Sequence, residues 1–120
     1  MIGIHCWSRV LTRREDAVLE DLVNHVDYIA KLTGSVDNIG FGTDFYPRRE
    51  PWSTFFDLTV RRKPRLAGET LLSPRILVGN DASGLPDLTA ALLARGYSDN
   101  DVKKVLGGNF LRVAKRVFGS

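Results

Sequence analysis

Two kinds of hydrophobic pattern alternate along this chain, short apolar runs and longer stripes with a helical period. The runs Met1–Trp7 and Val36–Thr43 have the nearly continuous apolar character of buried parallel strands. Between them, apolar side chains recur at three- and four-residue steps, which predicts an amphipathic helix over about Arg13–Thr33 that ends at Gly34. A strand, a helix and a second strand in this order predict a βαβ unit over residues 1–44.

Local signals set the ends of the predicted helix. Thr12-Arg13-Arg14-Glu15 is a capping-box sequence, in which the Thr12 hydroxyl and the Glu15 carboxylate can satisfy two backbone amides at a helix start. His25 lies inside the helix, where a lone histidine more often packs or forms a hydrogen bond than binds a ligand, so we favour a structural role over a catalytic one. The apolar stripe consists of Val18, Leu19, Leu22, Val23, Val26, Ile29 and Ala30.

The hydrophobic period is lost from residue 45 to residue 84. This stretch contains four prolines, scattered aromatic residues and the basic run Arg61–Arg65. Loops of such length are usually functional or disordered, and we interpret this one as a long loop on the active-site side of the fold. A basic run near aromatic residues is compatible with nucleic-acid binding, but a solvated loop is the interpretation we favour.

A helical period returns over residues 85–120, which predicts a set of closing helices. Pro86 suits the first turn of one helix, which Gly96 would close. Ser98–Asp101 predicts the start of a second helix by an acidic variant of the capping box. Gly107-Gly108-Asn109 is expected to break that helix at a structural turn, before a last helix over Phe110–Phe118.

Candidate chemistry gathers where the two predicted strands end. Because parallel strands present their carboxyl ends at the same edge of a sheet, His5, Cys6 and Trp7 are expected beside Asp44. Gly40 and Gly42 would let a substrate or another backbone come close to the second strand. Asp44 could simply be a turn or helix-capping aspartate, but its place after a βαβ unit favours a functional role.

Composition narrows the class of protein. With 120 residues, 43% hydrophobic, 26% charged and a net charge of +3, the sequence is that of one ordinary globular domain. The basic residues are dispersed among 14 acids, so nucleic acid is not an expected partner.

The single cysteine excludes an internal disulfide, and no Cys/His cluster has zinc-ligand spacing. No apolar run is long enough to span a membrane and no signal peptide is recognisable, which favours a cytoplasmic location.

Four motifs, in this order, resemble the C-terminal part of the renal (membrane) dipeptidase family of zinc metallopeptidases. They read HVDYIAKLTG, DNIGFGTDF, LPDLTAALLARGYS and DVKKVLGGNFLRV. The resemblance implies an α/β fold, the C-terminal portion of a (β/α)₈ TIM-type barrel, with the last two parallel strands and their helices. It also implies a site with two zinc ions and a bridging hydroxide that attacks the carbonyl of a dipeptide.

The resemblance further implies roles for individual residues. Asp44 matches the aspartate that ends the family's Gly-(Ser/Thr)-Asp-Phe motif, and it would be both catalytic and the residue that binds the substrate's ammonium group. Tyr46 and His5 would also bind substrate. The family more often continues Asp-Phe-Asp-Gly, whereas Tyr46 and Pro47 follow Phe45 here, which affects the expected dipeptide preference. No zinc ligand carries over, because the family's ligands lie on earlier strands.

Two functions therefore remain open. Residues 1–120 would be part of a zinc dipeptidase, or a non-catalytic fragment or interaction module of the same fold. Met1 already belongs to a predicted buried strand, so the true N-terminus is expected to lie upstream. A barrel of this type needs roughly 250 residues, so we expect the chain alone neither to hydrolyse dipeptides nor to bind zinc tightly. It is expected instead to associate with itself or with the missing N-terminal portion.

Overall fold

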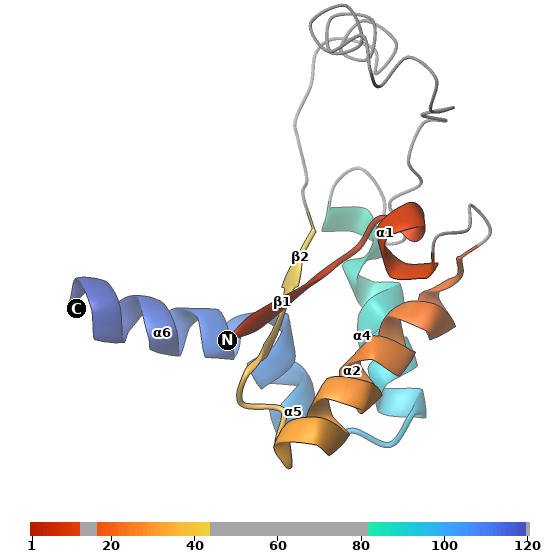
Figure 1. Cartoon of the computed structure of the whole chain (residues 1–120). Helices are drawn as coiled ribbons and strands as arrows, with labels where there is room; N and C mark the ends of the chain where they lie inside the picture. The colour runs from red at the N-terminus through yellow and green to blue at the C-terminus, as the bar shows by residue number, and fades with distance from the viewer. Residues whose placement is uncertain (13–16, 44–81, 120) are drawn as a thin grey trace, which may run out of the picture.

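The computed structural model describes residues 1–12, 17–43 and 82–119 of the chain. Figure 1 shows two adjacent strands with the helices gathered beside them. The elements are β1 (Ile2–His5), α1 (Ser8–Thr12), α2 (Leu19–Thr33), β2 (Ile39–Gly42), a 3₁₀ turn (Ala82–Gly84), α4 (Leu85–Ala94), α5 (Asp99–Lys103), a π-helical segment (Lys104–Gly108) and α6 (Asn109–Phe118).

The two strands are parallel neighbours, as the βαβ pattern predicts. Their register pairs Ile2 with Ile39 at one end and His5 with Gly42 at the other. Both strands are shorter than expected. The second begins only at Ile39 because residues 36–38 form a turn, in which the Ile39 amide donates to the Val36 carbonyl at 3.0 Å. The described chain is thus a mixed α/β arrangement with a two-stranded open sheet.

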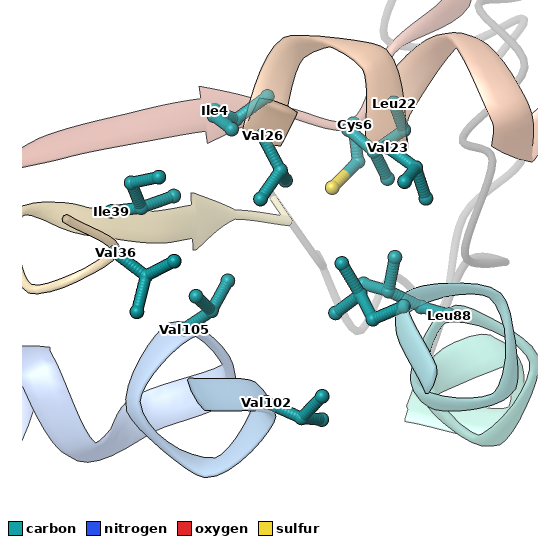
Figure 2. Close-up of a cluster of buried hydrophobic side chains, with 11 residues drawn as sticks. Ile4, Cys6, Leu22, Val23, Val26, Val36, Ile39, Leu88, Val102 and Val105 are labelled. Carbon is teal, nitrogen blue, oxygen red and sulfur yellow. The ribbon is translucent and has the colours of Figure 1, made fainter. Parts of the chain in front are cut away.

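One face of the sheet carries the hydrophobic core. Ile4 and Ile39 meet buried side chains from α2, α4 and α5, so these helices cover the same face (Figure 2). Full burial of one such aliphatic side chain stabilises the fold by about 1.5–3 kcal/mol. Because neighbouring strand residues point to opposite faces, Gly3, His5, Gly40 and Gly42 belong to the other face. The helix contribution to the core comprises Leu22, Val23, Val26, Leu88, Leu92, Val102 and Val105.

The predicted start of the long helix at Arg13 is wrong. Thr12 is the last residue of α1, and α2 begins only at Leu19. Val18 has an extended backbone with φ −116° and ψ 170°, so the helix does not run through it. The Asp21 carboxylate accepts a hydrogen bond from the Val18 amide at 2.9 Å, and this contact caps the helix. Glu15 lies outside the described residues. The predicted end is confirmed, since Gly34 has φ 72°.

Polar side chains tie α2 to its neighbours. The Nε2 atom of His25 lies 3.0 Å from the Leu11 carbonyl, a bond from α2 to α1 that fits the structural role favoured for this histidine. At the other side of α2, the Arg95 guanidinium contacts the carboxylates of Glu20 and Asp27. The Tyr97 hydroxyl donates to Asp27 at 2.7 Å, and burial together with this bond raises the pKa of Tyr97.

The starts of the C-terminal helices agree with their sequence signals. Pro86 lies in the first turn of α4, and the Ser98 hydroxyl accepts a hydrogen bond from the Asp101 amide at the start of α5. The expected break at Gly107-Gly108-Asn109 is confirmed, because the backbone is kinked between α5 and α6. The kink lies at Gly107, whose φ of 177° and ψ of −26° are non-helical.

The last helix, α6, projects from the body of the fold (Figure 1). Its apolar residues are largely exposed in the described chain: Phe110 45%, Leu111 64%, Val117 67% and Phe118 85%. Among the described helices, none has both the length and the apolar character needed to cross a membrane.

Candidate functional site at the carboxyl ends of the strands

The structure brings the carboxyl ends of β1 and β2 side by side, where the sequence places its candidate site. His5 is the last residue of β1 and pairs with Gly42, the last residue of β2. Asp44 and Tyr46 lie outside the described residues. Of the three predicted site residues, His5 is therefore the one whose surroundings can be described.

The His5 ring is held by the residue that follows the strand. Its Nδ1 atom accepts a hydrogen bond from the Trp7 backbone amide at 3.2 Å. The two rings meet edge to face, with centroids 5.1 Å apart and an interplanar angle of 74°. An edge-to-face contact of this geometry is favourable in its own right, so both contacts fix the orientation of the imidazole.

Cys6 does not converge on this site, which corrects the sequence-based expectation. Its side chain is fully buried among the core residues, on the face of the sheet that the helices cover. Burial raises the pKa of the Cys6 thiol to about 11, so the thiol is protonated at neutral pH. The side-chain alternation of a strand explains the error, because consecutive residues cannot both face the same side.

Gly40 and Gly42 differ in what packs over them, although the sequence predicts the same role for both. A Cβ atom on Gly40 would lie 2.6 Å from the Phe110 ring, so the missing side chain lets α6 pack on β2. A Cβ atom on Gly42 would meet only the Ile4 carbonyl oxygen, at 4.0 Å, among the described atoms. Gly40 is thus a packing position, whereas no described side chain comes within 4 Å of a Cβ at Gly42.

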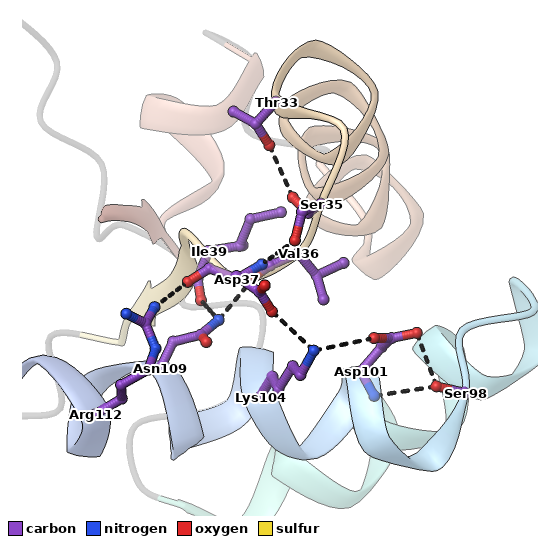
Figure 3. A network of polar contacts seen from close by, with 10 residues as sticks. All are labelled: Thr33, Ser35, Val36, Asp37, Ile39, Ser98, Asp101, Lys104, Asn109 and Arg112. Carbon is purple, nitrogen blue, oxygen red and sulfur yellow. Dashed lines mark hydrogen bonds and ion pairs between the residues drawn. The ribbon is translucent and has the colours of Figure 1, made fainter.

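At the opposite end of β2, Asn109 joins the strand to the C-terminal helices. This residue is buried, and its Nδ2 atom donates to the Val36 and Ile39 carbonyls, each at 2.8 Å (Figure 3). The Arg112 guanidinium donates to the Asp37 carbonyl in the same turn. The sequence predicts a structural role for Gly107-Gly108-Asn109 but does not reveal these acceptors, which come from a distant part of the chain.

An ion pair completes this end of the strand. Lys104 Nζ lies 2.8 Å from the Asp37 carboxylate and 4.0 Å from that of Asp101. The bond from Lys104 lowers the pKa of Asp37, and the same bond raises the pKa of Lys104.

An open hollow of about 410 Å³ lies beside this ion pair, lined by Asp37, Asn100, Lys103, Lys104, Gly108, Asn109 and Arg112. Because two of its cationic side chains bind Asp37, we assign this hollow to structure and place the candidate site at the other end of β2.

The residues that the structure describes do not fit a zinc site. Within residues 1–12, 17–43 and 82–119, no three side chains of His, Cys, Asp or Glu come together in a group that could hold a metal ion. His5 has its Nδ1 atom engaged by a backbone donor, and Cys6 faces the core. Whether the whole chain binds zinc stays a prediction.

Comparison with known proteins places the chain in a family. Residues 74–118 match the membrane dipeptidase family (peptidase family M19). The chain is 32% identical over 96 residues to dipeptidase ataJ of Aspergillus terreus, a match that covers 80% of this chain and 17% of ataJ. It is 29% identical over 104 residues to dipeptidase tcpJ of Claviceps purpurea, covering 86% of this chain and 18% of tcpJ.

A bacterial relative gives a similar match. An uncharacterized protein in the pqqA 5′ region of Klebsiella pneumoniae is 32% identical over 106 residues, or 88% of this chain and 30% of that protein. The chain thus spans less than a third of the length of each of these relatives. No solved structure matches the chain significantly. The four sequence motifs, the family match and the named dipeptidases agree, and the chain belongs to the membrane dipeptidase family.

Proposed function

We propose that these 120 residues form the substrate-side part of a metallodipeptidase active site, in a (β/α)₈ barrel whose last two strands are β1 and β2. The observation that carries the proposal is the parallel pairing of His5 with Gly42 at the carboxyl ends of the strands, two residues before Asp44 in sequence. In barrels of this kind the catalytic residues follow the carboxyl ends of the strands.

In this proposal Asp44 recognises the amino end of the substrate. A carboxylate opposite an ammonium group forms a charge-assisted hydrogen bond, which favours dipeptides with an unblocked amino terminus. The same carboxylate would stabilise charge that develops when the tetrahedral intermediate collapses. Tyr46 and His5 would contact the substrate from the same side of the barrel.

Two bound zinc ions would supply the activated hydroxide for peptide hydrolysis. The described residues do not form a zinc site, so the ligands would come from other parts of a barrel. The lengths of the relatives support a location of the zinc ligands outside this segment. The matches cover only 17% of ataJ and 18% of tcpJ.

Association with the rest of a barrel follows from the same proposal. A TIM-type barrel takes roughly 250 residues, about twice the length of this chain. The described sheet has two strands, and the exposed apolar face of α6 offers further surface for a partner. The partner would be the remaining barrel segment or a second copy of the chain, and the substrate would be a dipeptide.

A non-catalytic interaction module is the second candidate. The exposed apolar residues of α6 favour it, because a surface of this kind binds other proteins without any need for catalytic groups. This candidate keeps the fold and the association described above, but it predicts no turnover of dipeptides under any condition.

Dipeptide hydrolysis by an assembled protein separates the two candidates. Residues 1–120 would be joined to the part of dipeptidase ataJ that precedes the matched segment, with unmodified ataJ as the reference. We expect hydrolysis of unblocked dipeptides that a chelator abolishes and added zinc restores, and no cleavage of N-acetylated dipeptides. A folded chimera that contains zinc but hydrolyses no dipeptide would favour the non-catalytic module.

A further inference from the structure

We infer that Asn109 determines where a further strand joins the sheet. The edge of β2 that faces away from β1 is its outer edge. The Asn109 side chain closes the first part of this edge, and a parallel strand of the remaining barrel segment pairs with β2 from Phe41 onward. The inference rests on the proposed function and makes it more specific, because it names the edge and the register at which the two parts of the barrel meet.

The parallel ladder determines which residues of β2 face the outer edge. The Ile2 amide donates to the Asn38 carbonyl at 2.7 Å, so this carbonyl points toward β1. Successive strand residues direct their backbone groups to alternate edges, and the register is continuous over the paired residues. The backbone groups of Gly40 therefore face β1, whereas those of Ile39 and Phe41 face the outer edge.

Ile39, the first of these outward residues, already has partners for both backbone groups. Its amide donates to the Val36 carbonyl at 3.0 Å, and its carbonyl accepts a hydrogen bond from Asn109 Nδ2 at 2.8 Å (Figure 3). Asn109 is only 2% exposed, so water competes little for this bond. The Asn109 amide thus takes the place that a backbone N–H of a neighbouring strand would take.

The start of α6 also covers the sheet at this level. A Cβ atom on Gly40 would lie 2.6 Å from the ring of Phe110, the residue that follows Asn109. The first turn of α6 therefore occupies both the outer edge and one face of β2 at its amino-terminal half. A strand from another part of a barrel has access to the outer edge only from Phe41 onward.

Phe41 presents the next pair of outward backbone groups. Within residues 1–12, 17–43 and 82–119, the sheet has two strands, and no partner is found for these groups. An outward N–H and carbonyl form the template to which a further strand adds. We assign this position to a parallel strand of the barrel segment outside the match, because the matches cover only 17% of ataJ and 18% of tcpJ.

Pairing from Phe41 onward shifts the new strand toward the candidate site. A strand of four residues, the length of β2, that begins beside Phe41 would extend about two residues, or roughly 7 Å, past Gly42. The strands of a closed barrel must be staggered relative to one another. The Asn109 contact would set this stagger, and the new strand would end at the rim that the proposed function assigns to Asp44.

Amide hydrogen exchange, resolved to single residues by mass spectrometry, tests the outer edge in the 120-residue chain itself. Gly40 is the internal reference, because its amide faces β1. We expect the Phe41 amide to exchange about tenfold faster than that of Gly40, or more. Protection of Phe41 would overturn the inference. Protection that rises with protein concentration would assign the edge to a second copy, and constant protection would assign it to another part of the same chain.

The same measurement in the assembled protein used for the activity test detects the new strand. We expect exchange of the Phe41 amide to slow by about a hundredfold or more. An assembled protein that hydrolyses dipeptides but leaves Phe41 unprotected would overturn the inference and retain the proposed function. Protection of Phe41 in a zinc-containing protein without turnover would contradict the dipeptidase proposal and retain the inference.

A proline at position 41 tests the same edge by stability. Phe41→Pro removes the outward N–H and leaves the pairing with β1 intact, because strands tolerate proline where the N–H is not bonded. Phe41→Ala is the matched control, since it loses the ring and retains the N–H. The two variants should melt at the same temperature in the 120-residue chain, whereas Phe41→Pro should melt about 2 °C lower, or more, in the assembled protein. Equal melting in the assembled protein, or a lower value for Phe41→Pro in the chain alone, would overturn the inference.

Discussion

At the scale of single residues, Asn109 shows how one side chain determines the position of a strand. Its amide satisfies two carbonyls of the turn that leads into β2, and it does so from the start of α6. Buried carbonyls without a donor cost about 1–3 kcal/mol each. The carboxyl end of β2 contributes to the candidate site, so Asn109 supports that site from the opposite end of the strand.

Asn109→Asp tests this contact. The substitution keeps the shape of the side chain but replaces the donor with an oxygen that faces two carbonyl oxygens. We expect the free energy of unfolding to fall by about 2–4 kcal/mol, as measured by urea denaturation. Asn100→Asp is the matched control, because Asn100 is exposed in the first turn of α5 and its change should stay within about 0.5 kcal/mol. Equal effects of the two substitutions would refute the role of Asn109.

Gly40 and Gly42 provide a second test at this scale. Gly40→Ala introduces a Cβ atom 2.6 Å from the Phe110 ring, so we expect a loss of about 1–3 kcal/mol of stability. In a Phe110→Ala background, Gly40→Ala should cost much less stability, because the ring that it would clash with is gone. A double-mutant cycle of the two substitutions measures this difference. Gly42→Ala should be tolerated, since its nearest described neighbour is 4.0 Å away. A similar loss of stability in both single variants would contradict the proposed difference between the glycines.

At the scale of elements, the sequence predicts best what depends on nearby residues. Pro86 at the start of α4 and Ser98 at the start of α5 act within one helical turn, and the structure confirms both. The parallel strand pair also follows from the pattern, because a helix of 15 residues between two short apolar runs leaves few other arrangements.

Elements that depend on distant contacts were predicted less well. The start of α2 is a local exception: it was misplaced because the helix begins only at Leu19, where the Asp21 carboxylate accepts a hydrogen bond from the Val18 amide. The break at Gly107 was predicted, but the short π-helical stretch around it was not. Here the Asn109 side chain anchors the chain to the turn before β2, and that contact joins residues that are 73 and 70 positions apart.

Self-association through α6 is a prediction at this scale. Val117 and Phe118 are 67% and 85% exposed in the described chain, and Lys115 and Arg116 on the same helix are also exposed. We expect the isolated chain to form oligomers or aggregates, because exposed apolar faces and open strand edges associate in water. A Val117→Ser, Phe118→Ser double variant should reduce the mass measured by light scattering, whereas Lys115→Ser should not. A monomeric wild-type chain at high concentration would disprove the prediction.

At the scale of the whole molecule, the described elements form part of an α/β fold in which α2, α4 and α5 cover one face of the sheet. The other face carries His5 and the two glycines, and Phe110 of α6 lies over Gly40. That face is where the interior of a barrel would lie in the proposed function. The sequence predicted that the carboxyl ends of the two strands meet at one edge. Strand alternation could have shown that Cys6 faces away from His5, but the sequence could not show that the two glycines differ, because that difference depends on Phe110 of α6.

The role of Asp44 is the central claim, and the Asp44→Asn substitution in the assembled protein tests it most directly. The single measurement is kcat/KM for an unblocked dipeptide, with zinc content and melting temperature as controls. If Asp44 binds the substrate's ammonium group and stabilises the transition state, kcat/KM should fall by about a hundredfold or more, a loss of about 3 kcal/mol or more, with zinc content and fold unchanged. If Asp44 only caps a turn, asparagine should serve nearly as well, so near-wild-type turnover would contradict the account.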